Sequence, residues 1–220
     1  MAILGGTSNS SFILSSNNVT SWSNLGSAGK GNPIQFTQII KDGVNSHFHI
    51  GDIIYITDQG WLVNYTNGYA LLVSTYPLQA ITPIDPLYQD LTIESEDLAI
   101  IGDSNNHLFL LNNDETIYSM GYVGSAGTNT KINGIIAKEN IIVFKDNGMY
   151  NYNEFTFTLI MSGYFSCCYY DNNGIAYTAT NDSHIWKSID AGLTWTDLGK
   201  KGTSIITNIV KYGNQFIFIG

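Results

Sequence analysis

Residues 174–199 read GIAYTATNDSHIWKSIDAGLTWTDLG, and residues 1–26 read MAILGGTSNSSFILSSNNVTSWSNLG. The two stretches align without a gap at an offset of 173 residues, which places Trp22 on Trp195. The other matched positions pair Ser10 with Ser183, Ser15 with Ser188, Leu25 with Leu198 and Gly26 with Gly199. The offset equals four units of about 43 residues, the length of a four-stranded propeller blade. The internal repeat therefore predicts a β-propeller.

The chain between the two copies divides into short runs at the same period. Each run is rich in Ile, Val, Tyr, Phe and Thr, and turn formers such as Asn147-Gly148 separate the runs. No segment carries a sustained apolar stripe of helical period, so we expect almost no helix. The expected strands are residues 37–40, 52–57, 61–65 and 70–74; 91–93, 98–102, 107–111 and 116–120; 132–137, 141–144, 149–152 and 156–161; and 165–170, 175–180, 184–188 and 194–198.

The two ends of the sequence bear on the number of blades. Residues 1–6 match the second strand of a blade, so the first blade lacks its innermost strand. Residues 205–212 read as a first strand and residues 215–220 as a second. Closed propellers complete one blade with strands from both termini, which removes exposed edges. We expect one all-β domain over residues 1–220, a propeller of five four-stranded antiparallel blades; six or more blades within a longer chain is the alternative.

Composition excludes several classes of protein. Only 12% of the 220 residues are charged, the formal net charge is −9, and there is no arginine, so a nucleic-acid partner is not expected. No apolar run reaches the roughly 18 residues of a membrane span, and the first residues lack the features of a secretory signal. We expect a chain that does not insert into membranes. The adjacent Cys167 and Cys168 are expected to be free thiols on opposite faces of a strand.

Residues 188–195 contain a recognisable motif. The pattern Ser-x-Asp-x-Gly-x-Thr-Trp is complete here and resembles the Asp-box, also called the BNR repeat, of sialidase-like propellers and phage tail and virion proteins. The resemblance covers about 50 residues at the level of sequence. It implies a folding element between the outer two strands of a blade, with the indole packed against its own hairpin. The residues that match the motif are Ser188, Asp190, Gly192, Thr194 and Trp195.

An enzymatic function has little support in the sequence. Sialidases hold the carboxylate of their substrate with arginine side chains, and this chain has none. Another glycosidase needs two carboxylates across a sugar. The candidates for such a pair are Asp52, Asp58, Glu94, Glu96 and Asp97. Nothing in the sequence pairs them, so we expect no catalytic residues.

A metal site or a bound cofactor is not expected either. His47 and His49 are two positions apart, so in a strand both side chains would lie on one face. Two such imidazoles would supply half of the ligands of a zinc site. Such a pair is more often a polar strand face, and no further ligands stand out. The sequence therefore predicts a protein without metal or cofactor.

Two non-enzymatic functions remain. The low-charge, Asn- and Tyr-rich composition and the resemblance to phage propellers favour a structural protein of a virus particle, such as a tail, fibre or head decoration, with other virion proteins as partners. The alternative is a module that binds glycans through exposed aromatic and amide side chains. In the first case the protein is cytoplasmic before assembly and then part of the virion; an extracellular location without a signal peptide is the other possibility.

Overall fold

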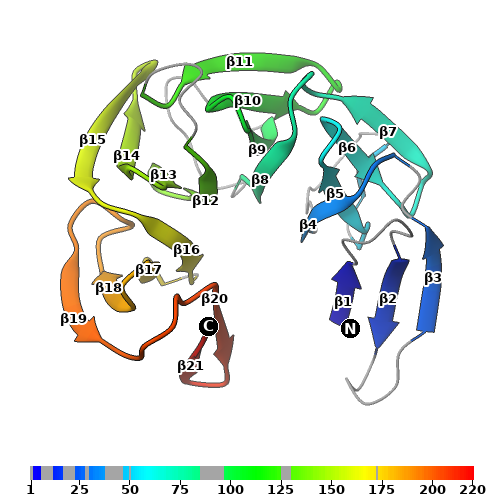
Figure 1. Ribbon diagram of the computed structural model, residues 1–220. Coiled ribbons are helices and arrows are strands. Elements are labelled where there is room, and N and C mark those ends of the chain that lie inside the picture. The colour runs from blue at the N-terminus through cyan, green and yellow to red at the C-terminus, as the bar shows by residue number, and fades with distance from the viewer. Residues whose placement is uncertain are drawn as a thin grey trace. The chain divides into compact units, whose positions relative to one another are not determined.

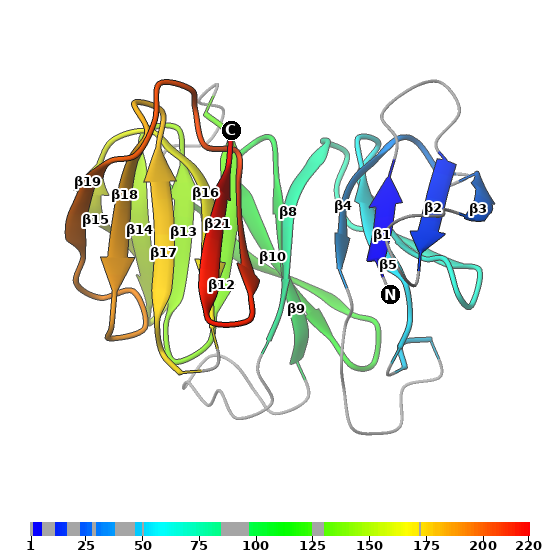
Figure 2. The same cartoon turned by 90° about the horizontal axis from the view of Figure 1, so that it is seen from below.

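The structure is a computed structural model that describes residues 2–5, 12–16, 23–27, 30–37, 47–49, 51–84, 97–124, 130–171 and 173–220 (Figures 1 and 2). All regular structure in these ranges is β-strand, and none of it is helix. Accordingly, none of the described residues belongs to a helix long and apolar enough to cross a membrane. The expected all-β fold is confirmed.

The strands form antiparallel sheets whose members follow one another along the chain (Figure 1). Within the described ranges four of these sheets have four strands, as expected for propeller blades. A three-stranded sheet consists of β1 (Ala2–Gly5), β2 (Phe12–Ser16) and β3 (Ser23–Ser27). The next two consist of β4 (Pro33–Thr37), β5 (Ile54–Thr57), β6 (Trp61–Asn64) and β7 (Tyr69–Leu72), and of β8 (Leu78–Pro83), β9 (Asp97–Asp103), β10 (His107–Asn112) and β11 (Ile117–Tyr122). The last three consist of β12 (Ile132–Ala137), β13 (Ile141–Lys145), β14 (Gly148–Asn153) and β15 (Thr156–Ser162); of β16 (Phe165–Tyr170), β17 (Ala176–Thr180), β18 (His184–Ser188) and β19 (Thr196–Lys200); and of β20 (Asn208–Tyr212) and β21 (Gln215–Ile219).

The chain packs as two compact units. Unit 1 contains Met1–Pro83, Glu96–Ser104 and Leu108–Ser119, and unit 2 contains Ile84–Ser95, Asn105–His107 and Met120–Gly220. Each unit buries its apolar side chains between neighbouring sheets. In unit 1 this core includes Ile56 and Leu62 of one sheet and Leu78, Ile101 and Leu111 of the next. In unit 2 it includes Ile136, Phe144, Met149, Phe165 and Ala176.

The inner strands of two sheets lie earlier in the chain than the sequence predicted. The strand expected at residues 37–40 runs from Pro33 to Thr37, and the strand expected at 91–93 is instead Leu78–Pro83. Residues 38–40 and 91–93 themselves lie outside the described ranges. β8 is an edge strand of its sheet and ends on Pro83. Proline is compatible with an edge strand but lowers the strand signal of its neighbourhood, so this run is hard to recognise from sequence.

The expected strands of unit 2 agree closely with the structure. β12, β16 and β18 have the predicted bounds, and the two cysteines of β16 lie on opposite faces as expected. Both thiols are free. Cys167 packs with Tyr177 and Ile206, whereas Cys168 belongs to the cluster around Phe144. Burial raises the pKa of Cys167 to about 11 and that of Cys168 further, so both are inert apolar packing groups.

The C-terminal hairpin occupies a defined position in unit 2. β20 and β21 pair from Asn208↔Ile219 to Tyr212↔Gln215. The ring of Phe216 lies 4.3 Å from the ring of Tyr177, so β21 covers a face of the β16–β19 sheet. Residues 215–219 are thus a paired strand, as expected for residues 215–220. That strands from both termini complete one blade stays a prediction.

Candidate functional site

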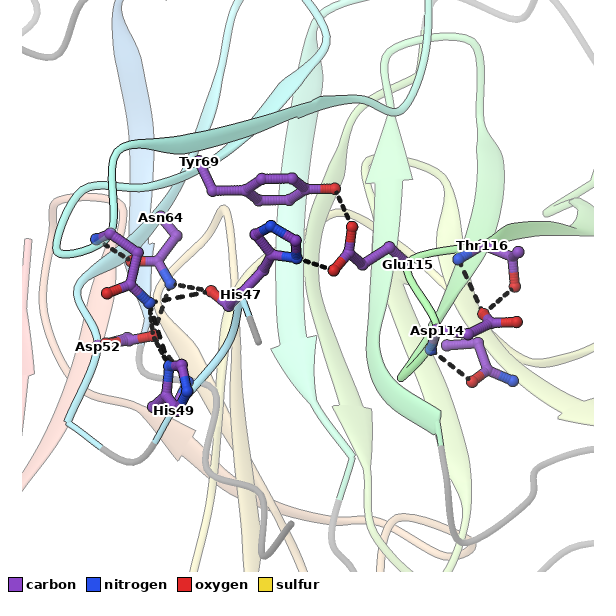
Figure 3. Close-up of polar contacts among 10 residues, drawn as sticks. His47, His49, Asp52, Asn64, Tyr69, Asp114, Glu115 and Thr116 are labelled. Carbon is purple, nitrogen blue, oxygen red and sulfur yellow. Dashed lines mark hydrogen bonds and ion pairs between the residues drawn. The ribbon is translucent and has the colours of Figure 1, made fainter. Parts of the chain in front are cut away.

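A network of polar side chains lies at one edge of unit 1 (Figure 3). It joins the segment before β5 with the β6–β7 turn and the β10–β11 turn. Phe48 anchors the first of these segments, because its side chain is buried in the core and its ring packs edge to face on Tyr69 at 5.6 Å. The polar side chains on either side of Phe48 are thereby directed toward the two turns.

The carboxylate of Asp52 holds the first segment to the β6–β7 turn. Its Oδ2 accepts hydrogen bonds from the backbone N–H of His49 at 2.7 Å, from Nδ2 of Asn64 at 2.6 Å and from Nδ2 of Asn67 at 3.0 Å. Asp52 is only 4% exposed. A buried carboxylate requires such donors, since an unpaired buried charge is costly. Asp52 is therefore an organising centre of the loop and not a free acid.

The carboxylate of Glu115 connects the β10–β11 turn to the preceding sheet. Its Oε1 contacts Nδ1 of His47, and its Oε2 accepts a hydrogen bond from the hydroxyl of Tyr69 at 2.9 Å. The rings of His47 and Tyr69 lie 4.2 Å apart. Burial, the hydrogen bond to Glu115 and the charge of Glu115 together raise the pKa of Tyr69 to about 12. One oxygen of Glu115 thus has a partner in the segment before β5 and the other has a partner in β7.

The two histidines do not form the strand-face pair considered from the sequence. They lie in irregular backbone rather than in a strand. His47 turns to Glu115, whereas Nδ1 of His49 lies 3.2 Å from Nδ2 of Asn67. In the described part of the chain, no group of three or more His, Cys, Asp and Glu residues is placed to hold a metal ion. The network is a set of polar clamps between loops.

Two of the acids considered for glycoside hydrolysis, Asp52 and Asp58, accept hydrogen bonds from amides. Asp58 accepts hydrogen bonds from the backbone N–H and the side-chain amide of Asn32, at 2.9 and 3.1 Å. Asp97 is buried at the start of β9, and Asp52 is engaged as described above. Glu94 and Glu96 lie outside the described residues. Amide groups of the chain thus engage the carboxylates of both Asp52 and Asp58.

The motif at residues 188–195 folds into a closed turn between β18 and β19. Oδ1 of Asp190 accepts the backbone N–H of Thr194 at 2.9 Å and the hydroxyl of Ser188 at 2.7 Å. Gly192 has φ +94, a value that disfavours other residues, and its N–H donates to the hydroxyl of Ser188. Burial alone would raise the pKa of Asp190, but hydrogen bonds from Thr194 and Ser188 outweigh it and lower the pKa. The carboxylate is a built-in part of the turn.

The sequence predicted that the indole of Trp195 packs against its own hairpin. In the structure it also packs against a second sheet. Its ring lies edge to face on Phe144 of the neighbouring sheet, with ring centres 5.8 Å apart, while its Nε1 donates to the carbonyl of Gly192 at 2.8 Å. A side chain at Gly192 would collide with Ile142 of that same sheet. The turn therefore packs against the neighbouring sheet of unit 2 through Gly192 and the ring of Trp195.

Lys145 is a buried cation that sequence reasoning missed. Its side chain is fully buried at the end of β13, and its Nζ donates to the carbonyl of Val123 at 2.6 Å. Burial lowers the pKa of Lys145 to about 8, and the neighbouring charge of Asp146 only partly offsets this. A lysine directly after the apolar run Ile141–Phe144 is the signal that could have identified it.

The roles of Glu115 and Tyr69 were also missed. The two residues lie 46 positions apart, close to one repeat of the chain. In a propeller, residues one period apart occupy matching positions of neighbouring blades. Pairs of complementary polar residues at that separation are therefore the pattern that points to contacts between sheets.

Several apolar side chains are exposed at hairpin turns of unit 2. Phe155 in the β14–β15 turn and Ile189 in the β18–β19 turn are each 74% exposed, and Tyr212 beside the β20–β21 turn is 78% exposed. The latter two turns lie at the same, lower end of the unit in Figure 2. Single exposed apolar residues are ordinary on protein surfaces. These three side chains are mostly outside the core, so they contribute little to the burial of apolar surface.

Comparison with known proteins identifies the fold. No family model and no curated protein sequence matches the chain. Solved structures do: Sqt1 from Saccharomyces cerevisiae has a TM-score of 0.67 at 11% identity over 99% of this chain, and the computationally designed Ika8 has 0.58 at 10% over 98%. YCF48 from Cyanidioschyzon merolae has 0.58 at 14% over 94%. The chain spans 66%, 64% and 73% of these structures, respectively. This chain has a propeller fold.

Proposed function

We propose that this chain is a non-enzymatic propeller that binds other proteins. In the finer form of the proposal it is a structural component of a virus particle, such as a phage tail, fibre or head decoration, and its partners are other virion proteins. It reaches the particle from the cytoplasm by assembly.

One contrast supports the binding function. The polar groups that could perform chemistry, Asp52, Asp58, Glu115 and Asp190, are occupied by hydrogen bonds within the chain. Three turns of unit 2 instead present an apolar side chain to solvent, namely Phe155, Ile189 and Tyr212. Apolar and aromatic side chains at a surface are the usual anchors of protein interfaces.

Two further observations support the finer proposal. Residues 188–195 match the Asp-box pattern at all five defining positions, and we propose that they are an Asp-box with a folding role. Propellers with this box are frequent in phage tail proteins. The charge-poor composition, 12% charged residues, also favours a protein that works inside an assembly over one that remains free in solution.

The proposal is tested by chemical cross-linking of the native source followed by density-gradient separation. We expect the chain to migrate with an assembled particle, in a fixed ratio to a second protein, and residues 150–195 to be cross-linked to that protein. A chain that stays free in the gradient would contradict the proposal.

Assays of the purified chain test the alternatives. We expect no hydrolysis of fluorogenic sialosides or other glycosides, and no saturable binding on a glycan array. Binding of a defined sugar there, with no protein partner in the gradient, would favour the glycan-binding module. Hydrolysis by the pure chain would favour an enzyme.

A further inference from the structure

The strand β21 has one open edge. It pairs with β20 in a two-stranded sheet, and within the described residues no third strand pairs with it. The carbonyl of Ile219 accepts the N–H of Thr207 at 2.7 Å, so the backbone groups of Ile219 point to the β20 side of the strand. Because this direction alternates along an antiparallel pair, those of Ile217 point the same way. The backbone N–H and C=O groups of Phe216 and Phe218 therefore point to the open edge.

The composition of β21 is that of a strand buried on both faces. Its residues from Phe216 to Ile219 are all apolar. Phe216 and Phe218 pack on Tyr177, with ring centres 4.3 and 6.3 Å apart. Ile217 and Ile219, on the opposite face, are 45% and 47% exposed. In β9 and β13, the second strands of four-stranded sheets, every residue is buried. One face and one edge of β21 thus lack the cover that second strands of the repeat have.

The outer edge strands of unit 2 carry features that hinder pairing with another chain, and β21 does not. The ladders of β15 and β19 each contain a register shift, and β19 contains Asp197 and Lys200. Such irregularities and charges are the usual protection of exposed edges. β21 pairs with β20 without a register shift and contains no charged residue, proline or glycine. Its open edge is therefore able to accept a further strand.

The order of the repeat does not assign that further strand to the β1–β3 sheet. Residues 2–5, which form β1, align with residues 175–178, and these overlap the second strand β17. β1 is thus a second strand, like β21 itself. The open edge of β21 is the place of a third strand, which in the four-stranded sheets is antiparallel to the second.

We propose that β21 pairs along its open edge with β21 of a second copy of this chain, antiparallel and about a two-fold axis. The joined sheet has the strand order β20-β21-β21-β20, which gives it the four antiparallel strands of a complete blade. Phe216 of one copy then pairs with Phe218 of the second copy through their outward backbone groups, and Ile217 lies opposite Ile217 of the second copy. This dimer goes beyond the proposed function and does not depend on it.

Charge does not oppose the pairing. Residues 120–220 contain seven lysines and seven acidic residues, so the acidic excess of the chain lies in residues 1–119. No charged side chain of one β21 meets a like charge in the other, because the strand has none. An unprotected apolar edge of this kind favours association of two identical strands.

Disulfide trapping tests the register of the pair. Directly opposed residues at a non-hydrogen-bonded position of an antiparallel pair lie within the reach of a disulfide. Mild oxidation of the full-length Ile217→Cys chain should therefore give a covalent dimer in non-reducing electrophoresis. Leu159→Cys is the matched control, since Leu159 is 50% exposed on the edge strand β15, and it should stay a single chain. The unchanged chain controls for Cys167 and Cys168.

Sedimentation over a dilution series tests the dimer without a cross-link. The unchanged chain should sediment at twice the mass of one chain. Ile217→Lys should sediment as a single chain with an unchanged circular dichroism spectrum, because it places like charges opposite each other on an exposed face. Leu159→Lys should remain a dimer.

Three results would overturn the inference: an unchanged chain that is monomeric throughout the series, a dimer that persists in Ile217→Lys, or equal cross-linking of the two cysteine variants. A monomer would leave the proposed function standing, since cross-linking of the particle decides that separately.

Discussion

Glu115 in unit 1 and Phe155 in unit 2 have nearly the same positive φ and opposite side-chain surroundings. Both lie in a turn between the third and fourth strands of a sheet, with φ of +71° and +64°. The side chain of Glu115 is held by His47 and Tyr69, whereas that of Phe155 is 74% exposed. Positive φ alone thus does not reveal the role of a residue. At Glu115 the contacts of the side chain offset the strain inside the fold, whereas the exposed side chain of Phe155 contributes little burial to offset it.

The largest effect is expected where unit 1 depends on its polar clamps. Asp52→Ala would leave the N–H of His49 and the amides of Asn64 and Asn67 without their acceptor, at a cost of about 2–4 kcal/mol in the free energy of unfolding. Urea denaturation measures it. Asp114→Ala is the matched control, because Asp114 is an exposed acid whose carboxylate accepts hydrogen bonds from its near neighbour Thr116. Equal effects of both variants would show that the network is not a clamp.

Unit 2 should respond to alkaline pH through its buried lysine. The pKa of Lys145 is about 8 in the folded chain, against an ordinary value of 10.5, so the unfolded chain binds more protons between these values. The contribution of Lys145 to the free energy of unfolding should therefore rise by about 3 kcal/mol as pH increases from about 8 to 10.5, whereas the raised pKa values of Cys167 and Cys168 lower stability with pH in the same window. In Lys145→Met this rise should be absent. Denaturation curves of both proteins across that window give the difference, and parallel pH profiles would contradict a buried, weakly compensated cation.

A smaller loss is expected at the closed turn of unit 2. Asp190→Ala removes the acceptor of Thr194 and Ser188 and should cost about 1–2 kcal/mol. Because the folded pKa of Asp190 is lowered, its contribution is present above the ordinary pKa of aspartate and is lost as pH falls through the folded value. Thermal unfolding at neutral and acidic pH measures both effects. An unchanged melting temperature in Asp190→Ala would show that the turn does not depend on this carboxylate.

The smallest effects come from the two glycine substitutions that test the comparison directly. Each relieves a positive φ by about 1 kcal/mol. Phe155→Gly should therefore stabilise by about 0.5–1 kcal/mol, whereas Glu115→Gly also loses its two partners and should destabilise by a similar amount. Melting temperatures of the two variants should move in opposite directions. Movement in the same direction would show that the two turns are equivalent after all.

Local patterns predicted much of the fold and some of the candidate site. The bounds of β12 and β16 follow from runs of strand-forming residues flanked by turns, and the hydrogen bonds of residues 188–195 connect neighbours in sequence. Both are short-range properties, so they can be read from the sequence. The inner strand Leu78–Pro83 does not follow from a fixed period, because the connection from its end at Pro83 to the start of β9 at Asp97 is long.

The sequence by itself determined that this chain is an all-β repeat protein, since alternation, turn residues and periodicity are properties of neighbouring residues. Tertiary structure alone decided which side chains meet. Glu115 meets His47 across 68 residues, and Trp195 packs on Phe144 of another sheet. Such contacts depend on how sheets pack, which no local pattern encodes. The same reason applies to Phe155, whose residue type suggests the core and whose position at a strained turn places it in solvent.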